Sequence, residues 1–456
     1  MNIKHQPELD PGYLPPIIWK RNYLEAIKKY QDCEPIAITM KRAAQSISRW
    51  DGIISPSHPD TAFYLERIFK HLLWMKGGYE IKISNRDYAA QLAASYSAQG
   101  ERKFDFASKS KTSGRALEIS YAPLAELEAE SEIMLSLGGH LDGCRIGFDL
   151  GGSDRKCAAV KDGVVLFSEE IAWDPYFQTN PQYHLDGIRD SLRRAAAHLP
   201  RVDAIGGSAA GVYVDNEVRA ASLFRGINQV DFDKNIRNLF HDLQKEWGIP
   251  FEVLNDGEVT ALAGSMSLKS NAVLGVSMGT SVAAGYVTAD GKLTPWLNEL
   301  AFVPVDYRPN APIDEWSGDR GCAVQYFCQQ GVARLAKVAG LNYGDLPFPE
   351  QLVKVQELME QGDERAASIY RTIGSCFGYT IADWTEFYDI KKILFLGRVS
   401  SGVGGEIIME KAQEVLAAEF AELAQNLEVA MPDETMKRHG QAIAAASLPS
   451  IEPRIA

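Results

Sequence analysis

The chain has 456 residues, of which 46% are hydrophobic, and this is enough material for two or three domains with buried cores. Its formal net charge of −13 argues against a nucleic-acid or anionic-membrane surface spread over the whole protein. The first residues lack the pattern of a signal peptide, and no apolar run approaches the roughly 18 residues that a membrane span needs. We therefore expect a cytoplasmic protein that has no membrane segment. Its six cysteines are scattered, which predicts reduced, mostly buried thiols.

The first region, residues 1–140, contains 18 Lys and Arg and 17 Asp and Glu, which gives it a net charge of +1. The remaining residues therefore carry a net charge of −14. Periodicity predicts helices over 22–31, 61–78 and 86–98, and strands over 79–84 and 116–122. The second of these helices should stop at Gly77-Gly78. We interpret residues 1–140 as an α+β accessory region of unknown role. The Gly-rich stretch 135–143 joins it to the following part of the chain.

Residues 141–456 alternate strand and helix, which predicts an α/β architecture. The expected strands cover 144–150, 157–171, 202–208, 251–256, 272–278, 283–294 and 392–398, and the expected helices cover 183–199, 235–248, 258–268, 323–340, 350–362, 366–388 and 407–425. A sequence of strand, small-residue turn, strand, Asp-Gly turn and strand occurs twice, with its Asp-Gly pairs at Asp162-Gly163 and Asp290-Gly291. This repetition indicates two related lobes.

Four motifs carry candidate chemistry. Asp149 precedes Gly151, Gly152 and Ser153, where glycines let the backbone approach an anion and the carboxylate can hold Mg²⁺. A plain hairpin turn is the alternative. Gly279 and Thr280 form a second candidate phosphate turn, for which a buried bend is the alternative.

A strand ends at Asn255-Asp256 directly before a helix, where Asp256 is either a helix N-cap or a general base for a hydroxyl that attacks phosphorus. The last motif is the glycine-rich loop after the strand at 392–398, which contains Gly397, Arg398 and Ser400. Such a loop can admit an adenine and ribose, or it is an ordinary connection between strand and helix.

The order of these motifs resembles the actin-like ATPase superfamily, and more narrowly the ROK family of sugar kinases and sugar-responsive repressors, over residues 145–445. The resemblance implies a two-lobed, ribonuclease-H-like α/β fold with an additional α+β N-terminal region. It places the lobes at 141–260 and 261–456, after the accessory region at 1–140.

The same resemblance implies ATP-dependent phosphorylation of a hexose or modified hexose, with Asp256 as the general base and Mg²⁺ held by Asp149 through the nucleotide. Asn255, Glu299 and Gly211 would contact the sugar. Gly151, Gly152, Ser153, Gly279, Thr280, Gly397, Arg398 and Ser400 would bind the nucleotide. We expect a homodimer and do not expect DNA binding, although residues 62–98 have some helix-turn-helix character. The alternative is a catalytically weak or inactive sugar sensor of the same family.

The sequence departs from this family at several positions. Family members often carry a structural zinc held by one His and three Cys, but here Phe302 takes the His position and only Cys322 remains, so we expect no zinc. Val324 replaces a Glu of the same region. Asp154 stands where the family often has Lys, and Arg398 stands where glycine is common. These changes favour a sugar ligand that differs from the usual sugar of the family, or weak use of ATP.

Overall fold

The computed structural model describes residues 3–42, 46–135, 137–433, 436 and 440–451. The chain forms two compact units. The larger unit comprises Met1–Ile133, Ser277–Ala283 and Pro295–Met431, and the smaller unit comprises Met134–Val276, Ala284–Thr294 and Pro432–Ala456. Each unit is thus built from three separate stretches, and the three consecutive domains expected from the sequence stay a prediction.

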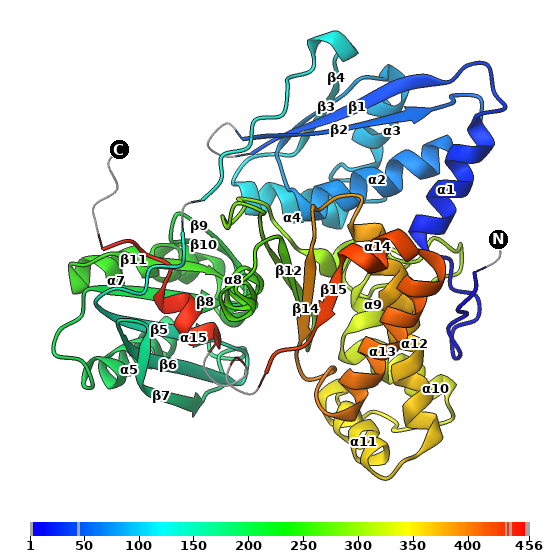
Figure 1. Cartoon of the computed structure of the whole chain (residues 1–456). Coiled ribbons are helices and arrows are strands. Elements are labelled where there is room, and N and C mark those ends of the chain that lie inside the picture. Colours follow the sequence, from blue (N-terminus) through cyan, green and yellow to red (C-terminus); the bar gives the residue numbers. More distant parts are fainter. Residues whose placement is uncertain (1–2, 43–45, 136, 434–435, 437–439, 452–456) are drawn as a thin grey trace. The chain divides into compact units, whose positions relative to one another are not determined.

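The smaller unit contains a five-stranded sheet in the order β11-β8-β5-β6-β7 (Figure 1). Its strands are β5 (Cys144–Leu150), β6 (Asp154–Lys161), β7 (Val164–Ala172), β8 (Ala204–Ala209) and β11 (Phe251–Asn255). The strands β5, β8 and β11 are parallel, whereas β6 and β7 are antiparallel to their neighbours. The parallel strands therefore end at one edge of the sheet, where ligands of α/β proteins commonly bind.

Side chains of β5 alternate between the two faces of this sheet. Ile146, Phe148 and Leu150 share a core with residues of α5 (Pro181–Ala196) and α7 (Leu239–Trp247). On the other face, α15 (Gln441–Ala446) packs so closely that a Cβ at Gly147 would collide with the backbone of Ala442. Asp149 shares the face of Gly147, because side chains in a strand alternate with a period of two. The remaining elements of the unit are β9 (Val212–Val214), β10 (Glu217–Ala220), α6 (Gln229–Asp231) and α8 (Asp256–Leu268).

The N-terminal region has its own sheet in the order β2-β1-β3-β4. Its elements are α1 (Pro16–Ile27), β1 (Glu34–Lys41), β2 (Ile47–Ile54), α2 (Thr61–Met75), β3 (Glu80–Ile83), α3 (Arg86–Ser95), α4 (Lys103–Ser113) and β4 (Glu118–Tyr121). The α+β composition expected from the sequence is confirmed, and α2 ends just before Gly77, which has φ 74°. The strand pair β1 and β2 was not expected.

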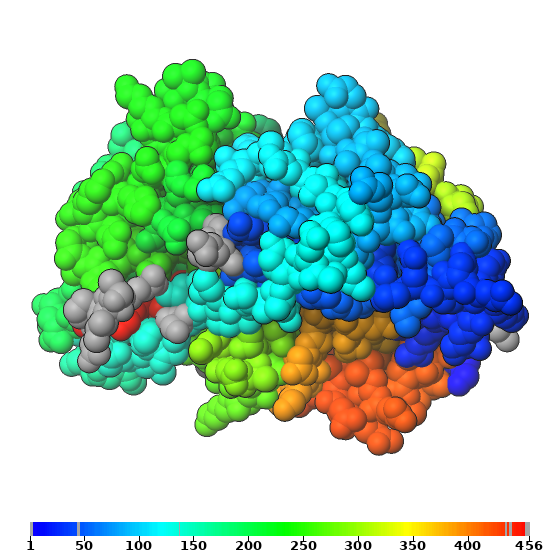
Figure 2. Space-filling view, turned by 90° about the horizontal axis from the view of Figure 1, so that it is seen from above, coloured from blue at the N-terminus to red at the C-terminus, as the bar shows by residue number. Residues whose placement is uncertain are grey.

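The N-terminal region and residues 295–431 belong to the same larger unit, and charged contacts join them. Lys20 on α1 pairs with Asp383 at 2.9 Å, and both side chains are buried. The guanidinium of Arg21 lies over the ring of Phe420 at 4.9 Å. Figure 2 shows this arrangement as dark blue N-terminal surface beside the orange surface of the later helices.

The rest of the larger unit is mostly helical, with α12 packed along α13. Its elements are α9 (Val324–Phe327), α10 (Gln329–Val338), α11 (Phe348–Glu360), α12 (Glu364–Trp384), β14 (Lys392–Leu396), α13 (Val403–Glu419), α14 (Ala421–Asn426) and β15 (Glu428–Ala430). A second sheet has the order β13-β12-β14-β15, in which β12 (Val273–Met278) and β13 (Val282–Val287) are divided between the units.

Two expected elements differ from the structure. The single helix predicted over 323–340 is broken at Cys328, which has an extended backbone and caps α10 through its sulfur. The strand predicted after Asp290-Gly291 is reduced to isolated bridges of Leu293 with Val287 and Leu135. All six cysteines are free thiols and five of them are buried, as predicted. No helix among the described residues is long and apolar enough to cross a membrane.

Candidate active site

Two carboxylates of the smaller unit interact at the carboxyl ends of its parallel strands. Asp149 lies next to the end of β5, and Asp256 is the first residue of α8, directly after β11. The hydroxyl of Ser208 on β8 donates to Asp149 Oδ1 at 2.7 Å. Burial raises the pKa of Asp149, although the Ser208 bond and Lys156 oppose this rise. Burial and the charge of Asp149 together raise the pKa of Asp256 to about 6. A carboxyl with this pKa is poised to accept a proton near neutral pH.

Asn255 shapes the loop beside Asp256. Its Nδ2 donates to the carbonyl of Gly211 at 2.7 Å, and its Oδ1 accepts from the backbone N–H of Gly257 at 2.8 Å. The second bond caps α8, so Asn255 is the N-cap of this helix. The alternative role that the sequence offered for Asp256, that of the N-cap, is therefore filled by Asn255. Gly211 has φ 139°, and a Cβ there would collide with Ala221. The structure thus brings Asn255, Gly211 and Asp256 together, and their contacts to a sugar stay a prediction.

The first glycine turn joins β5 to β6 and is braced by an aromatic side chain. The backbone N–H of Gly151 donates to the carbonyl of Asp154 at 2.9 Å, and Trp173 Nε1 donates to the carbonyl of Gly151 at 2.8 Å. A Cβ at Gly152 would collide with the hydroxyl of Tyr176. A residue with a Cβ at position 152 would therefore require the Tyr176 side chain to move, whatever the turn binds.

Asp154, the acid that departs from the family pattern, is partnered locally. Its carboxylate accepts from the Ser153 hydroxyl at 2.9 Å and lies 3.7 Å from Lys156 Nζ. Lys156 is also the cross-strand neighbour of Asp149. A cation is therefore present at this edge, two residues after the expected position.

The second glycine turn and the predicted adenosine loop lie side by side in the larger unit. The carbonyl of Met278 accepts from the backbone N–H of Val399 at 3.0 Å. Gly397 has φ 112°, and a Cβ there would collide with the Met278 backbone. Around Gly279 a Cβ would meet nothing within 4 Å, so the turn faces open space. Thr280 beside it is exposed. The open space at Gly279 is compatible with a phosphate, and the binding of a phosphate or nucleoside at these positions stays a prediction.

The other residues of the predicted adenosine loop come shortly before the N-terminus of α13 in the chain. Ser400 is buried and its hydroxyl donates to the carbonyl of Gly397 at 3.2 Å. The Arg398 side chain is exposed, and its carbonyl accepts from the Gln356 amide at 2.8 Å. The start of a helix is a favourable place for an anion. Binding of nucleotide by these residues stays a prediction.

Glu299 precedes a short 3₁₀ turn, Leu300–Phe302, that packs on the N-terminal region. Its backbone N–H donates to the carbonyl of Trp74 at 3.1 Å. The ring of Phe302 lies 4.3 Å from that of Trp74 and 5.3 Å from that of Phe104. Aromatic packing thus occupies the position that the zinc-binding His takes in the family. No group of three or more potential metal ligands is found among the described residues, and the absence of zinc in the protein stays a prediction.

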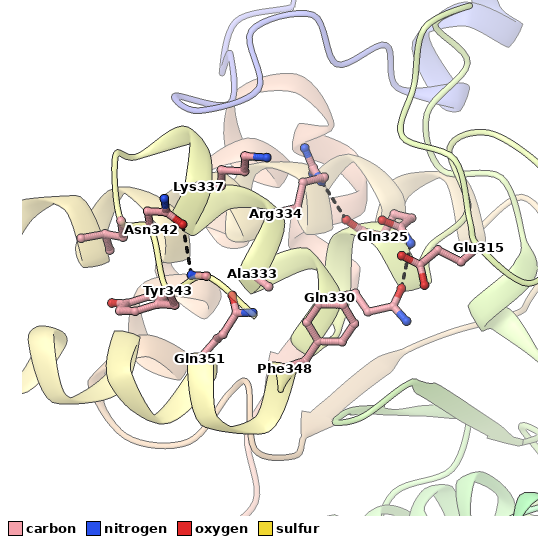
Figure 3. Close-up of a pocket in the computed structure, with 12 residues that line it drawn as sticks. Glu315, Gln325, Gln330, Ala333, Arg334, Lys337, Asn342, Tyr343, Phe348 and Gln351 are labelled. Carbon is pink, nitrogen blue, oxygen red and sulfur yellow. Dashed lines mark hydrogen bonds between the residues drawn. The ribbon is translucent and has the colours of Figure 1, made fainter. Parts of the chain in front are cut away.

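Figure 3 shows a separate pocket of about 390 Å³ in the larger unit. It is lined by polar side chains of α9 to α11 and the loops beside them, among them Gln325, Gln330, Arg334 and Gln351. Arg334 Nε donates to the carbonyl of Gln325 at 3.2 Å, and Gln325 Nε2 donates to Gln330 at 2.8 Å. None of the residues that the sequence assigned to sugar or nucleotide lines this pocket.

A model of the ROK family matches residues 145–446, which is more than half of the chain. The chain belongs to the ROK family. Residues before 145 lie outside the match, in agreement with the additional N-terminal region expected from the sequence. No curated protein is similar enough to the chain to count as a match.

Solved structures of ROK proteins share the fold. A glucokinase from Streptomyces griseus in complex with glucose and AMPPNP is 21% identical, with a TM-score of 0.52, 67% of this chain covered and 98% of that one. A hexokinase from Thermus thermophilus is 18% identical, with a TM-score of 0.51 and coverages of 67% and 98%. A transcriptional regulator homologous to the Escherichia coli MLC protein is 16% identical, with a TM-score of 0.52 and coverages of 75% and 82%. These structures confirm the actin-like α/β fold of the ROK sugar kinases.

The sequence alone did not point to three residues of these sites. Ser208 binds Asp149, and its signal was available, because a small hydroxyl residue at the end of a strand parallel to β5 must lie beside Asp149. Trp173 and Trp74 have no such local signal, since each reaches its partner only through tertiary packing.

Proposed function

We propose that this ROK protein is an ATP-dependent kinase that phosphorylates a hydroxyl of a hexose or modified hexose, with Asp256 as the general base. The observation that carries the proposal is the pKa of Asp256, raised to about 6 by burial and by Asp149, at the carboxyl end of a parallel strand. A base with a pKa near the working pH accepts the proton of the attacking hydroxyl most effectively. The names of the Streptomyces and Thermus proteins support the same class of reaction.

The residues present suit a nucleotide with Mg²⁺. Asp149 is a buried carboxylate with a neighbouring carboxylate, so a divalent cation near it would offset their repulsion. When bound, MgATP supplies the phosphoryl group that is transferred. Gly279 leaves open space for a phosphate, and Gly397 holds the neighbouring loop against Met278. Asn255 fixes the start of α8 and with it the position of Asp256.

A sugar sensor without kinase activity is the second candidate, favoured by the fold shared with a transcriptional regulator and by the acid at Asp154. One experiment separates the two candidates. ADP release is measured with MgATP and a panel of hexoses and N-acetylhexosamines, and sugar binding is measured in parallel by calorimetry. ADP release that depends on one sugar supports the kinase. Sugar binding without ADP release supports the sensor.

A further inference from the structure

The pocket of Figure 3 lies wholly within the larger unit, apart from the residues of the proposed phosphoryl transfer. Its volume of about 390 Å³ is within the range of about 300–1,000 Å³ that is usual for small-molecule sites. One wall is formed by Gln330 and Ala333 of α10, and another by Phe348 and Gln351 in the first turn of α11. Gln325 of α9 also lines the pocket. The cavity is large enough for a small molecule of several polar groups.

The amide side chains around this pocket are fixed at one end and open at the other. Gln325 Nε2 donates to Gln330 Oε1 at 2.8 Å, which leaves Gln325 Oε1 and Gln330 Nε2 without a hydrogen-bond partner among the described residues. Gln351 Nε2 donates to the carbonyl of Leu346 at 2.7 Å, and its Oε1 likewise has no partner in the described part of the chain. Gln325 is only 7% exposed, and a nearly buried acceptor without a partner is costly unless something in the pocket donates to it.

The charged side chains of the pocket balance one another. Arg334 pairs with Asp10, whose carboxylate lies 2.8 Å from the guanidinium. Lys337 and Glu315 are exposed, and neither forms an ion pair within the described ranges of the chain. They contribute one positive and one negative charge, so an anion that is attracted by Lys337 is repelled by Glu315. The pocket is therefore suited to an uncharged ligand.

An exposed aromatic ring completes the set of groups. Phe348 is 36% exposed, so its ring is accessible to a ligand. A sugar hydroxyl both donates and accepts hydrogen bonds and therefore matches the single open donors and acceptors of the amides. The C–H groups of a sugar ring can pack on the apolar ring of Phe348. An apolar ligand would leave the amides unpaired, and the phosphates of a nucleotide would meet the carboxylate of Glu315.

We propose that this pocket is a second carbohydrate site, separate from the active site, that binds an uncharged mono- or disaccharide. The amides of Gln325, Gln330 and Gln351 bind its hydroxyls, and Phe348 packs on its ring. The inference goes beyond the proposed function, in which the sugar lies beside Asn255 in the smaller unit.

The test is calorimetric titration of the full-length protein without nucleotide. The probes are glucose, mannose, N-acetylglucosamine, maltose, gluconate and adenosine. Ala333→Trp fills the pocket from α10, and the matched control Ala417→Trp adds the same side chain at an exposed position of α13. We expect binding of an uncharged sugar to this site to be lost in Ala333→Trp and unchanged in Ala417→Trp. Gluconate and adenosine should bind there at least tenfold more weakly than that sugar.

A second variant tests the polar contacts without filling the cavity. Gln330→Leu removes the open donor with little change in volume and should weaken binding of the same sugar about tenfold. Its control is Gln361→Leu at the exposed end of α11, which should leave the affinity unchanged. Melting temperatures are measured for each variant. Should Ala333→Trp melt early, the comparison of Gln330→Leu with Gln361→Leu decides.

Asn255→Ala separates this site from the proposed active site. Sugar binding that survives Asn255→Ala and disappears in Ala333→Trp supports the inference. If all sugar binding survives Ala333→Trp and Gln330→Leu with wild-type affinity, the inference is rejected, and its loss in Asn255→Ala would still support the proposed function. Preferred binding of gluconate or adenosine in the pocket rejects the carbohydrate class. A wild type that binds none of these sugars rejects the inference, and sugar-dependent ADP release then decides the proposed function by itself.

Discussion

Asp149 on β5 and Asp256 at the start of α8 are two carboxylates whose interaction, together with burial, raises the pKa of Asp256 to about 6. A general base acts only when it is deprotonated, so the rate of sugar phosphorylation should fall as the pH drops below about 6. Asp149→Asn removes the neighbouring negative charge and should move this acidic limb to lower pH, while it also slows the reaction. The pH dependence of kcat/KM measures the limb. An acidic limb at the same pH in both proteins would contradict the coupling.

Asp256→Asn should reduce kcat by about 10²–10⁴-fold and largely spare sugar binding, since an amide cannot accept the proton. The change should not lower stability at pH 8. The folded-state pKa of Asp256 is raised above its unfolded value of 3.8, so the folded protein binds the proton more tightly and loses stability as the pH rises from about 4 to about 6. Melting temperatures at pH 4.5 and pH 8 check this sign. Retained turnover would reject the role of Asp256.

Asp319 lies in a buried cluster that joins the N-terminal region to the later part of the larger unit. It pairs with Arg67 at 3.0 Å, Lys70 at 2.6 Å and Arg102 at 2.5 Å. Burial alone would raise its pKa, but these three cations outweigh burial and lower it. The contribution of Asp319 to stability is therefore present at neutral pH and is lost as the pH falls through the acidic range.

Asp319→Asn should destabilise the larger unit by about 3–5 kcal/mol, because it leaves buried cations without their partner. The matched control is Asp51→Asn, which breaks the exposed pair with Arg49 and should cost less than about 1 kcal/mol. Urea unfolding at pH 7 measures both changes. Equal effects of the two substitutions would show that the cluster does not anchor the region.

Gly397→Ala should weaken the binding of nucleotide. The new Cβ would collide with the backbone of Met278, and φ 112° is unfavourable for alanine, so the loop must move away from the second glycine turn. The control is Gly362→Ala, where φ is also positive but nothing lies within 4 Å of the new Cβ. Titration with ATP should show at least a tenfold loss for Gly397→Ala alone. Equal losses in both variants would indicate a general effect of backbone strain.

Local patterns in the sequence were sufficient for the parts of the fold that depend on neighbouring residues. The strand and glycine turn at Asp149 to Ser153 and the strand end at Asn255 follow from periodicity and turn chemistry, and the structure contains both. The order of such motifs along the chain was enough to suggest the ROK family, which the family match confirms. The prediction of a single helix across Cys328 was wrong, because the periodicity of the hydrophobic residues gives no sign of the extended backbone at Cys328.

Only the tertiary structure decided which distant residues meet. Arg67 and Asp319 are 252 positions apart, and no spacing rule relates them, because a buried ion pair depends on where the fold places each element. For the same reason the sequence did not relate Lys109 to Trp74, since the two residues lie on different helices, α4 and α2. The sequence thus determined the motifs and their order, whereas packing placed Lys109 beside Trp74 and joined the N-terminal region to the later helices in one unit.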